Sequence, residues 1–199
     1  MQQNSSPAVS RPNTDVRVGR LFYFVALAVC GCALDLWTKS AIFAWLGSPL
    51  QTTDNTWWLW EPFVGIQTSL NPGALFGLGQ GYSKLFALLS VFAAGAILYW
   101  VIWRGATNDV LLTSSLGCIM GGIFGNLYDR LGLWHDGNVP IEFAHAVRDW
   151  ILFQYEPYTW PNFNIADSLL VCGAGLLIVH AYRMELAAKR QQKPKADKA

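Results

Sequence analysis

The chain has 199 residues, of which 53% are apolar and only 14% are charged. Soluble domains carry about 25% charged residues, so the composition indicates a membrane protein and excludes an ordinary soluble domain. The formal net charge of +1 also excludes the broad basic surface of a nucleic-acid-binding protein, and we expect no nucleic-acid partner.

Four apolar segments are long enough to cross a bilayer as helices, which takes about 20 residues each. They are residues 21–46, 85–103, 110–128 and 166–182. The first segment carries Asp35 and Lys39, and the fourth begins with Asp167. Because charged side chains inside a membrane need a partner or a function, these two segments point to a site. The predicted fold class is an all-α membrane protein with four transmembrane helices.

Basic residues are concentrated before the first span, in the turn after the second, and after the fourth. They are Arg11, Arg17, Arg20, Arg104 and the series from Arg183 to Lys198. By the positive-inside rule, both termini are cytosolic and the loops 47–84 and 131–165 face outward. We expect residues 1–19 to form a disordered tail and 186–199 a basic tail, disordered from Lys189, so that residues 20–185 form the membrane domain.

The segment 17–32 loosely resembles a cleavable signal peptide, because Arg17 and Arg20 precede an apolar run. Three further spans and the helical spacing of Asp35 and Lys39 favour a retained first helix instead. All four cysteines, Cys30, Cys32, Cys118 and Cys172, fall within apolar stretches. They are interpreted as small buried apolar residues rather than disulfides, and we expect no metal site.

The first outward loop has the residue pattern of short strands. Trp57 to Trp60 and Phe63 to Ile66 are aromatic or apolar runs, and the turn residues Asn71, Pro72 and Gly73 follow them. These runs predict a small outward-facing β cradle on the bilayer. In the second loop, residues 147–153 return to an apolar setting and are expected to form an interfacial loop that dips into the membrane.

Acidic residues from three helices are predicted to lie at one depth. With a helical rise of about 1.5 Å per residue, Asp35 lies ~22 Å from Arg20, Asp129 ~28 Å from Val110, and Asp167 ~24 Å from Arg183. In a hydrocarbon core roughly 30 Å thick, that depth is the outer third. The convergence of three costly acids predicts a functional site near the outward face.

Structural ion pairing is the alternative explanation for these acids. Asp35 and Lys39 are one helical turn apart and can pair. Asp129 can form a brace at its helix end with the adjacent Arg130. Asp167 can be stabilised by the positive N-terminus of the last helix.

Asp149 is the loop acid that stands out, because apolar residues surround it. The turns at Pro157 and Pro161 allow the chain to fold back and bring Asp149 toward Asp167. Spacing alone does not choose between Asp149 and Asp129 as the partner of Asp167.

Five sequence blocks, in this order on four predicted spans, resemble the lipoprotein signal peptidases, a family of membrane aspartyl peptidases also called signal peptidase II. The blocks are 35–39 (DLWTK), 71–76 (NPGALF), 121–130 (GGIFGNLYDR), 147–150 (VRDW) and 163–167 (FNIAD). The resemblance covers residues 20–185. It implies four transmembrane helices with an outward cradle of strands.

The resemblance also implies that Asp149 and Asp167 are the catalytic dyad, with no cofactor. It implies supporting or substrate-binding roles for Asp35, Lys39, Asn71, Gly73, Asn126, Asp129, Arg130, Asn164 and Ala166. The implied substrates are diacylglyceryl-modified prolipoproteins in the membrane lipid, cleaved on the amino side of the lipidated Cys. The implied location is the bacterial inner membrane, with the site toward the outer face. We expect a monomer.

Two features depart from the family pattern. The segment from Leu131 to Arg148 is longer than expected, and Arg148 lies next to the implied catalytic acid. His135 and His145 in this segment are interpreted as interfacial residues rather than catalytic bases.

Three other functions would also use residues of these kinds. A proton-coupled transporter would use the acids as a relay, but its acids should lie near the midplane. A membrane scaffold would use them only as ion pairs. A serine or cysteine peptidase would need a His at the same depth as its nucleophile, and the sequence places none at the depth of Ser69 or Ser83.

Overall fold

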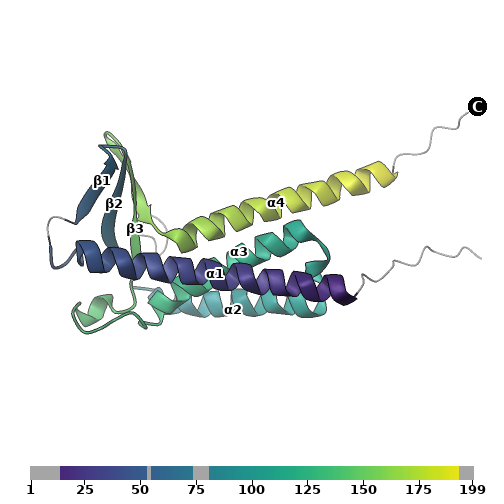
Figure 1. Ribbon diagram of the computed structural model, residues 1–199, viewed down its shortest axis with the longest axis horizontal. Helices are drawn as coiled ribbons and strands as arrows, with labels where there is room; N and C mark the ends of the chain where they lie inside the picture. Colours follow the sequence, from purple (N-terminus) through teal and green to yellow (C-terminus); the bar gives the residue numbers. More distant parts are fainter. Residues whose placement is uncertain (1–13, 53–54, 74–80, 193–199) are drawn as a thin grey trace, which may run out of the picture.

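The computed structural model describes residues 14–52, 55–73 and 81–192. Its main elements in chain order are α1 (Thr14–Leu46), β1 (Thr56–Trp60), β2 (Val64–Asn71), α2 (Ser83–Trp103), α3 (Val110–Arg130), β3 (Val147–Tyr155), β4 (Tyr158–Phe163) and α4 (Ile165–Gln192). The four helices run alongside one another, and the strands gather at one end of them (Figure 1). The predicted tails 1–13 and 193–199, and Ala74 to Phe76 of the second family block, lie outside the described residues.

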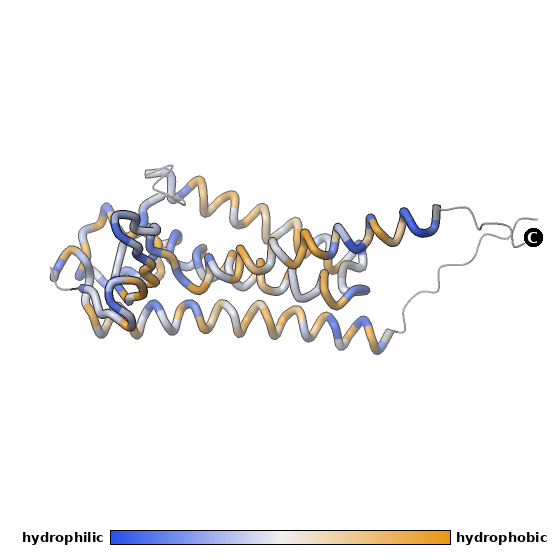
Figure 2. The backbone as a smooth tube through the Cα atoms, turned by 90° about the horizontal axis from the view of Figure 1, so that it is seen from above, coloured by the Kyte–Doolittle hydropathy of each residue, from blue (hydrophilic) through white to orange (hydrophobic). Residues whose placement is uncertain are grey.

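All four helices are long and apolar enough to cross a membrane, which confirms the predicted fold class. Apolar residues follow the helices along most of their length (Figure 2). In α3, 67% of the most apolar stretch is buried, against at most 22% in the other three helices. Helix α3 is therefore the centre of the bundle, and its buried residues form the core with Phe24, Ala28, Ala94 and Val101.

Two helices are longer than predicted. Residues 14–19 were expected to be disordered, but α1 begins at Thr14. The reason is that Arg17 donates to the Ile102 carbonyl, and Arg20 to the Thr107 and Asn108 carbonyls, at the turn between α2 and α3. Helix α4 likewise continues to Gln192, which corrects the disordered tail expected from Lys189 onward. A pair between Lys189 and Glu185 supports this extension.

The strands form one antiparallel sheet in the order β1-β2-β3-β4. The strands predicted in the first outward loop are present as β1 and β2. Residues 147–153, expected as an interfacial loop, are instead part of the inner strand β3. Pairing with β2 on one side and β4 on the other satisfies its backbone groups. The pairing with β2 joins residues far apart in the chain, whereas β4 follows β3 directly as the second strand of a hairpin.

The cysteines are free, as predicted, but their expected burial is wrong. Cys30 and Cys172 are exposed, and Cys32 and Cys118 are partly exposed. They lie on apolar helices whose outer faces are suited to lipid, so an apolar segment did not mean a buried side chain.

Candidate functional site

A cluster of buried polar side chains lies where α1, α3 and α4 meet the sheet. Its members with at most 5% of their surface exposed are Asp35, Lys39, Asn126, Asp129, Arg148, Asp149 and Asn164. Buried charges are costly unless paired and hydrogen-bonded. The contacts of each member therefore define what the cluster can do.

Lys39 is the centre of the cluster. Its Nζ lies 2.7 Å from Asp35 Oδ2 and 3.3 Å from Asp129 Oδ2, and it donates to Asn126 Oδ1 at 2.9 Å. The predicted pair of Asp35 and Lys39 is present. Lys39 also links α1 to α3.

Asp149 is almost completely buried on β3, with 1% of its surface exposed. Its Oδ1 accepts from Asn164 Nδ2 at 2.6 Å, and its Oδ2 accepts from Asn71 Nδ2 at 3.1 Å. Asn71 is itself fixed, because its Oδ1 accepts from the backbone N–H of Gly73 at 3.0 Å. Burial and the nearby negative charge of Asp167 raise the pKa of Asp149 to about 8.

Asp167 lies in the first turn of α4 and is half-buried. Its Oδ1 accepts from Asn126 Nδ2 at 2.8 Å, and its Oδ2 accepts from the backbone N–H of Asn164 at 3.3 Å. Asn164 Oδ1 in turn accepts from the Asp167 N–H at 2.9 Å, as in a capping box. Asn164 therefore contacts both carboxyl groups, and it brings Asp149 and Asp167 to the same point.

Arg130 is half-buried at the C-terminal end of α3. Its guanidinium lies over the Phe86 ring, 5.7 Å from the centroid, and interacts electrostatically with Asp167, Asp149 and Asp129. Within the described part of the chain, its buried Nε has no hydrogen-bond partner. A buried cation with an unused donor next to two carboxyl groups is suited to bind an oxygen that carries negative charge.

The alternative in which Asp129 forms a brace with the adjacent Arg130 does not describe its ion pairs. Asp129 pairs instead with Arg148 of β3, whose Nη2 lies 2.8 Å from Asp129 Oδ1, and with Lys39. Arg148 is adjacent to Asp149 in the sequence, but its pairing with Asp129 could not be predicted from that position. Its signal was a cation in the middle of an apolar strand.

Two glycines of α3 allow the helices to approach closely at the cluster. A Cβ added to Gly125 would clash with the Asp35 carboxylate, and one added to Gly122 would lie 2.5 Å from the Ala166 carbonyl oxygen. The Ala166 N–H donates to Asp35 Oδ1 at 2.8 Å. The block containing these glycines therefore positions α1 and α4 against α3.

The histidines and serines considered from the sequence have ordinary contacts. His135 is hydrogen-bonded to the Val139 carbonyl, and His145 to the Arg130 carbonyl. Ser83 donates to the Pro72 carbonyl, and Ser69 lies opposite Asp149 in the sheet. The residues with roles implied by the family resemblance lie in the cluster or contact it, except Gly73, which contacts Asn71.

Four membrane-length helices with a buried carboxyl cluster beneath a small sheet define a multi-pass membrane protein with a candidate acid–base site. Comparisons with known proteins identify the family. The family model for signal peptidase (SPase) II matches residues 27–183. The chain belongs to the signal peptidase II family and is a peptidase of the bacterial inner membrane.

Individual relatives agree with this assignment. The lipoprotein signal peptidase of Rhodopirellula baltica is 51% identical over 164 residues, which are 82% of this chain and 73% of that protein. That of Geobacillus thermodenitrificans is 34% identical over 81% of this chain and 89% of its own. A bacterial membrane enzyme solved at 2.3 Å by the in meso method has the same fold, with a TM-score of 0.67, 24% identity, and coverage of 89% of this chain and 96% of that one.

Proposed function

We propose that this protein removes signal peptides from diacylglyceryl-modified prolipoproteins, and that Asp149 and Asp167 are its catalytic dyad. The observation that carries the proposal is that Asn164 hydrogen-bonds both carboxyl groups inside a largely buried cluster. Membership of the signal peptidase II family supports the substrate class. The peptidase domain is residues 20–185.

The two carboxyl groups divide the acid and base roles because their surroundings differ. Asp149 is buried and its raised pKa favours the protonated form at neutral pH. Asp167 is half-exposed, so it is the member that meets water and serves as the base. Ionised Asp167 takes a proton from a water molecule as that water attacks the scissile carbonyl carbon. Asp149 donates its proton to the developing oxyanion. When the tetrahedral intermediate collapses, Asp167 gives the proton taken from water to the leaving amide nitrogen, and a hydroxyl group of the intermediate returns a proton to Asp149.

Arg130 and Asn71 bind the parts of the peptide that gain or carry negative charge. The unused Nε of Arg130 and its positive charge stabilise the oxyanion in the transition state. Asn71 holds Asp149 and lies beside the scissile bond, where its amide orients a substrate carbonyl. No covalent acyl-enzyme is required by this arrangement.

The lipid part of the substrate is bound by an apolar groove among α1, α2 and α3. The groove has a volume of about 420 Å³, and its lining includes Leu36, Leu98 and Phe124. Leu36 follows Asp35 of the cluster directly. The acyl chains therefore remain in an apolar setting while the bond on the amino side of the lipidated Cys reaches the dyad.

The proposed orientation places both helix ends that carry basic residues in the cytosol. Arg17 and Arg20 bind the turn between α2 and α3, at the opposite end of the bundle from the sheet (Figure 1). The sheet and the dyad then lie at the outer face of the membrane, where a lipoprotein precursor presents its lipidated Cys. We propose that the protein acts as a monomer.

The test is cleavage of a purified precursor by the protein in detergent. We expect the diacylglyceryl-modified precursor to be cut, and mass spectrometry to find the lipidated Cys at the new amino terminus. The same precursor with that Cys replaced by Ser, which cannot be lipidated, should remain intact. Equal cleavage of both precursors would contradict the proposed substrate class.

A further inference from the structure

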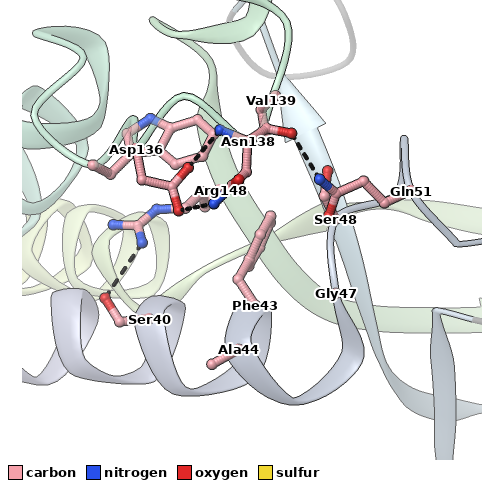
Figure 3. Close-up of a pocket in the computed structure, with 11 residues that line it drawn as sticks. Ser40, Phe43, Ala44, Gly47, Ser48, Gln51, Asp136, Asn138, Val139 and Arg148 are labelled. Carbon is pink, nitrogen blue, oxygen red and sulfur yellow. Dashed lines mark hydrogen bonds between the residues drawn. The ribbon is translucent and has the colours of Figure 1, made fainter.

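Arg148 lies on β3 next to Asp149, and its side chain binds on the far side of the strand from the dyad. Its Nε and Nη2 donate to Asp129 at 3.2 and 2.8 Å, and its backbone N–H donates to Asp129 Oδ2 at 3.0 Å. Its Nη1 donates to Ser40 Oγ of α1 at 3.3 Å, the contact drawn in Figure 3. Only 5% of its surface is exposed. Arg148 therefore joins β3, α3 and α1 through one guanidinium group.

The long segment after α3 covers this guanidinium. The Trp134 ring lies 5.2 Å from it, and Trp134 Nε1 donates to the Ala146 carbonyl at 3.1 Å. Trp134 also packs edge-on against Phe43 of α1 at 6.5 Å. The pocket outside Arg148, about 550 Å³ in volume, lies between this segment and the end of α1 (Figure 3).

Arg148 balances the charges of the cluster. Charged groups reach the dyad from every element around it: Asp35 and Lys39 of α1, Asp129 and Arg130 of α3, Asp167 of α4, and Arg148 of β3. With one proton on the dyad, three carboxylates face three cations. Without Arg148, the cluster would carry one net negative charge. Ionising a carboxyl group next to surplus negative charge is unfavourable.

Arg148 also determines what Lys39 can do. Lys39 is 2.7 Å from Asp35 and 3.3 Å from Asp129, and its third contact is Asn126, which holds Asp167. Because Arg148 pairs with Asp129, Lys39 does not have to neutralise that carboxylate alone. Its bond to Asn126 is thereby kept, and Asn126 keeps Asp167 in place.

We infer that Arg148 is a positioning residue for the dyad: it holds Asp129, it preserves the contact of Lys39 with Asn126, and it keeps the cluster electrically neutral. Trp134 of the long segment after α3 packs against this guanidinium and helps to fix its position. The inference rests on the proposed function of Asp149 and Asp167.

The test compares pH–rate profiles of full-length variants in detergent on the lipidated precursor. We expect Arg148→Met to shift both limbs of the profile to higher pH by about half a unit or more, because loss of the cation raises the pKa of Asp149. Its kcat should fall with little change in KM. Arg148→Lys, which keeps the charge, should keep the limbs in place. Lys84→Met removes an exposed cation at the start of α2 and is the matched control, with an unchanged profile.

A second pair of variants tests the charge balance from the other side, by removing a carboxylate. Asp129→Asn removes a negative charge and should shift the limbs to lower pH, and the double variant with Arg148→Met should return them to the wild-type position. This pair carries the test if Arg148→Met alone does not fold.

Two results would overturn the inference. One is a wild-type profile in folded Arg148→Met. The other is an equal loss of activity in Arg148→Met and Arg148→Lys, with the limbs of both profiles at the wild-type pH. That result would mean that Arg148 acts through packing alone. Cleavage by Asp149→Asn or Asp167→Asn would instead mean that the proposed dyad is wrong, whatever Arg148 does.

Discussion

Asn164 contacts two carboxyl groups with different surroundings. Asp149 is sealed inside the cluster on β3, whereas Asp167 is half-exposed at the start of α4. Carboxyl groups placed this close cannot both ionise at low cost, so burial selects Asp149 to keep the proton. The pair then titrates as a unit, and its activity should report both ionisations.

The pKa of Asp149, raised to about 8 by burial and by the charge of Asp167, predicts how cleavage depends on pH. Protonated Asp149 is the acid, so its function is present below that pKa and is lost as the pH rises through about 8. We expect kcat/KM, which reports the ionisations of the free enzyme, to fall roughly tenfold per pH unit beyond this point. Melting temperatures measured at the same pH values separate this loss from unfolding. A rate that stays constant to pH 10 would contradict the assignment of Asp149 as the acid.

Some contacts of single residues could be predicted from the sequence and others could not. The depth of Asp35, Asp129 and Asp167 followed from helical rise, and their convergence is present in the structure. The partner of Asp129 did not follow, because Arg148 is adjacent to it only through the fold of a distant strand. The choice of Asp149 over Asp129 came from the family resemblance, and it stays a prediction.

Helix α3 holds the site together because it has glycine where α1 and α4 pass closest. Gly125 faces the Asp35 carboxylate, and Gly122 faces the Ala166 carbonyl. A larger residue at either position would push a neighbouring helix away and separate the groups of the cluster. The close spacing of α1 and α4 from α3 therefore depends on glycine, which has no side chain, at these two positions.

The substitution Gly125→Ala tests this arrangement. We expect it to lower the free energy of unfolding by about 1–3 kcal/mol and to reduce cleavage, because the new methyl group clashes with Asp35. Gly95→Ala of α2 is the matched control, since an added Cβ there meets nothing within 4 Å. It should leave activity unchanged and stability equal or slightly higher. Unfolding in detergent followed by circular dichroism measures the stability of both variants, and cleavage of the lipidated precursor measures their activity. Equal effects of the two substitutions would rule out the close-approach explanation.

The elements differ in how well the sequence predicted them. The four helices were predicted because apolar segments of about 20 residues are typical of transmembrane helices. The central residues of each predicted span lie within the corresponding helix. Their ends were not, because the extension of α1 to Thr14 depends on bonds from Arg17 and Arg20 to another turn. Strand β3 was missed because its pairing with β2 joins residues far apart in the chain. Strand β4 pairs only with β3, in a hairpin that was missed because residues 147–153 were interpreted as an interfacial loop.

The molecule as a whole has two different ends. The sheet and the carboxyl cluster lie at one end of the helices, and the basic residues of α1 and the last turn of α4 lie at the other (Figure 1). A bilayer around the helices would separate these ends into two compartments. The proposed orientation follows from that separation and from the positive-inside rule.

Cysteine labelling of whole cells tests the orientation. In a background with the four native cysteines replaced by Ala, Asp136→Cys in the exposed turn after α3 should react with a membrane-impermeant maleimide once the outer membrane is permeabilised. Lys189→Cys near the end of α4 should react only after the inner membrane is opened. The reverse pattern would place the site in the cytosol and contradict the proposed topology.

The most direct test of the central claim is the cleavage rate of Asp149→Asn and Asp167→Asn on the lipidated precursor. Each Asn is nearly isosteric with Asp but cannot exchange the proton, so both folded variants should lose about 10²–10⁴-fold in rate. Asp136→Asn, an exposed carboxylate outside the cluster, is the control and should cleave normally. Cleavage at the wild-type rate by either folded dyad variant would contradict the account, and Asp129 would become the next candidate.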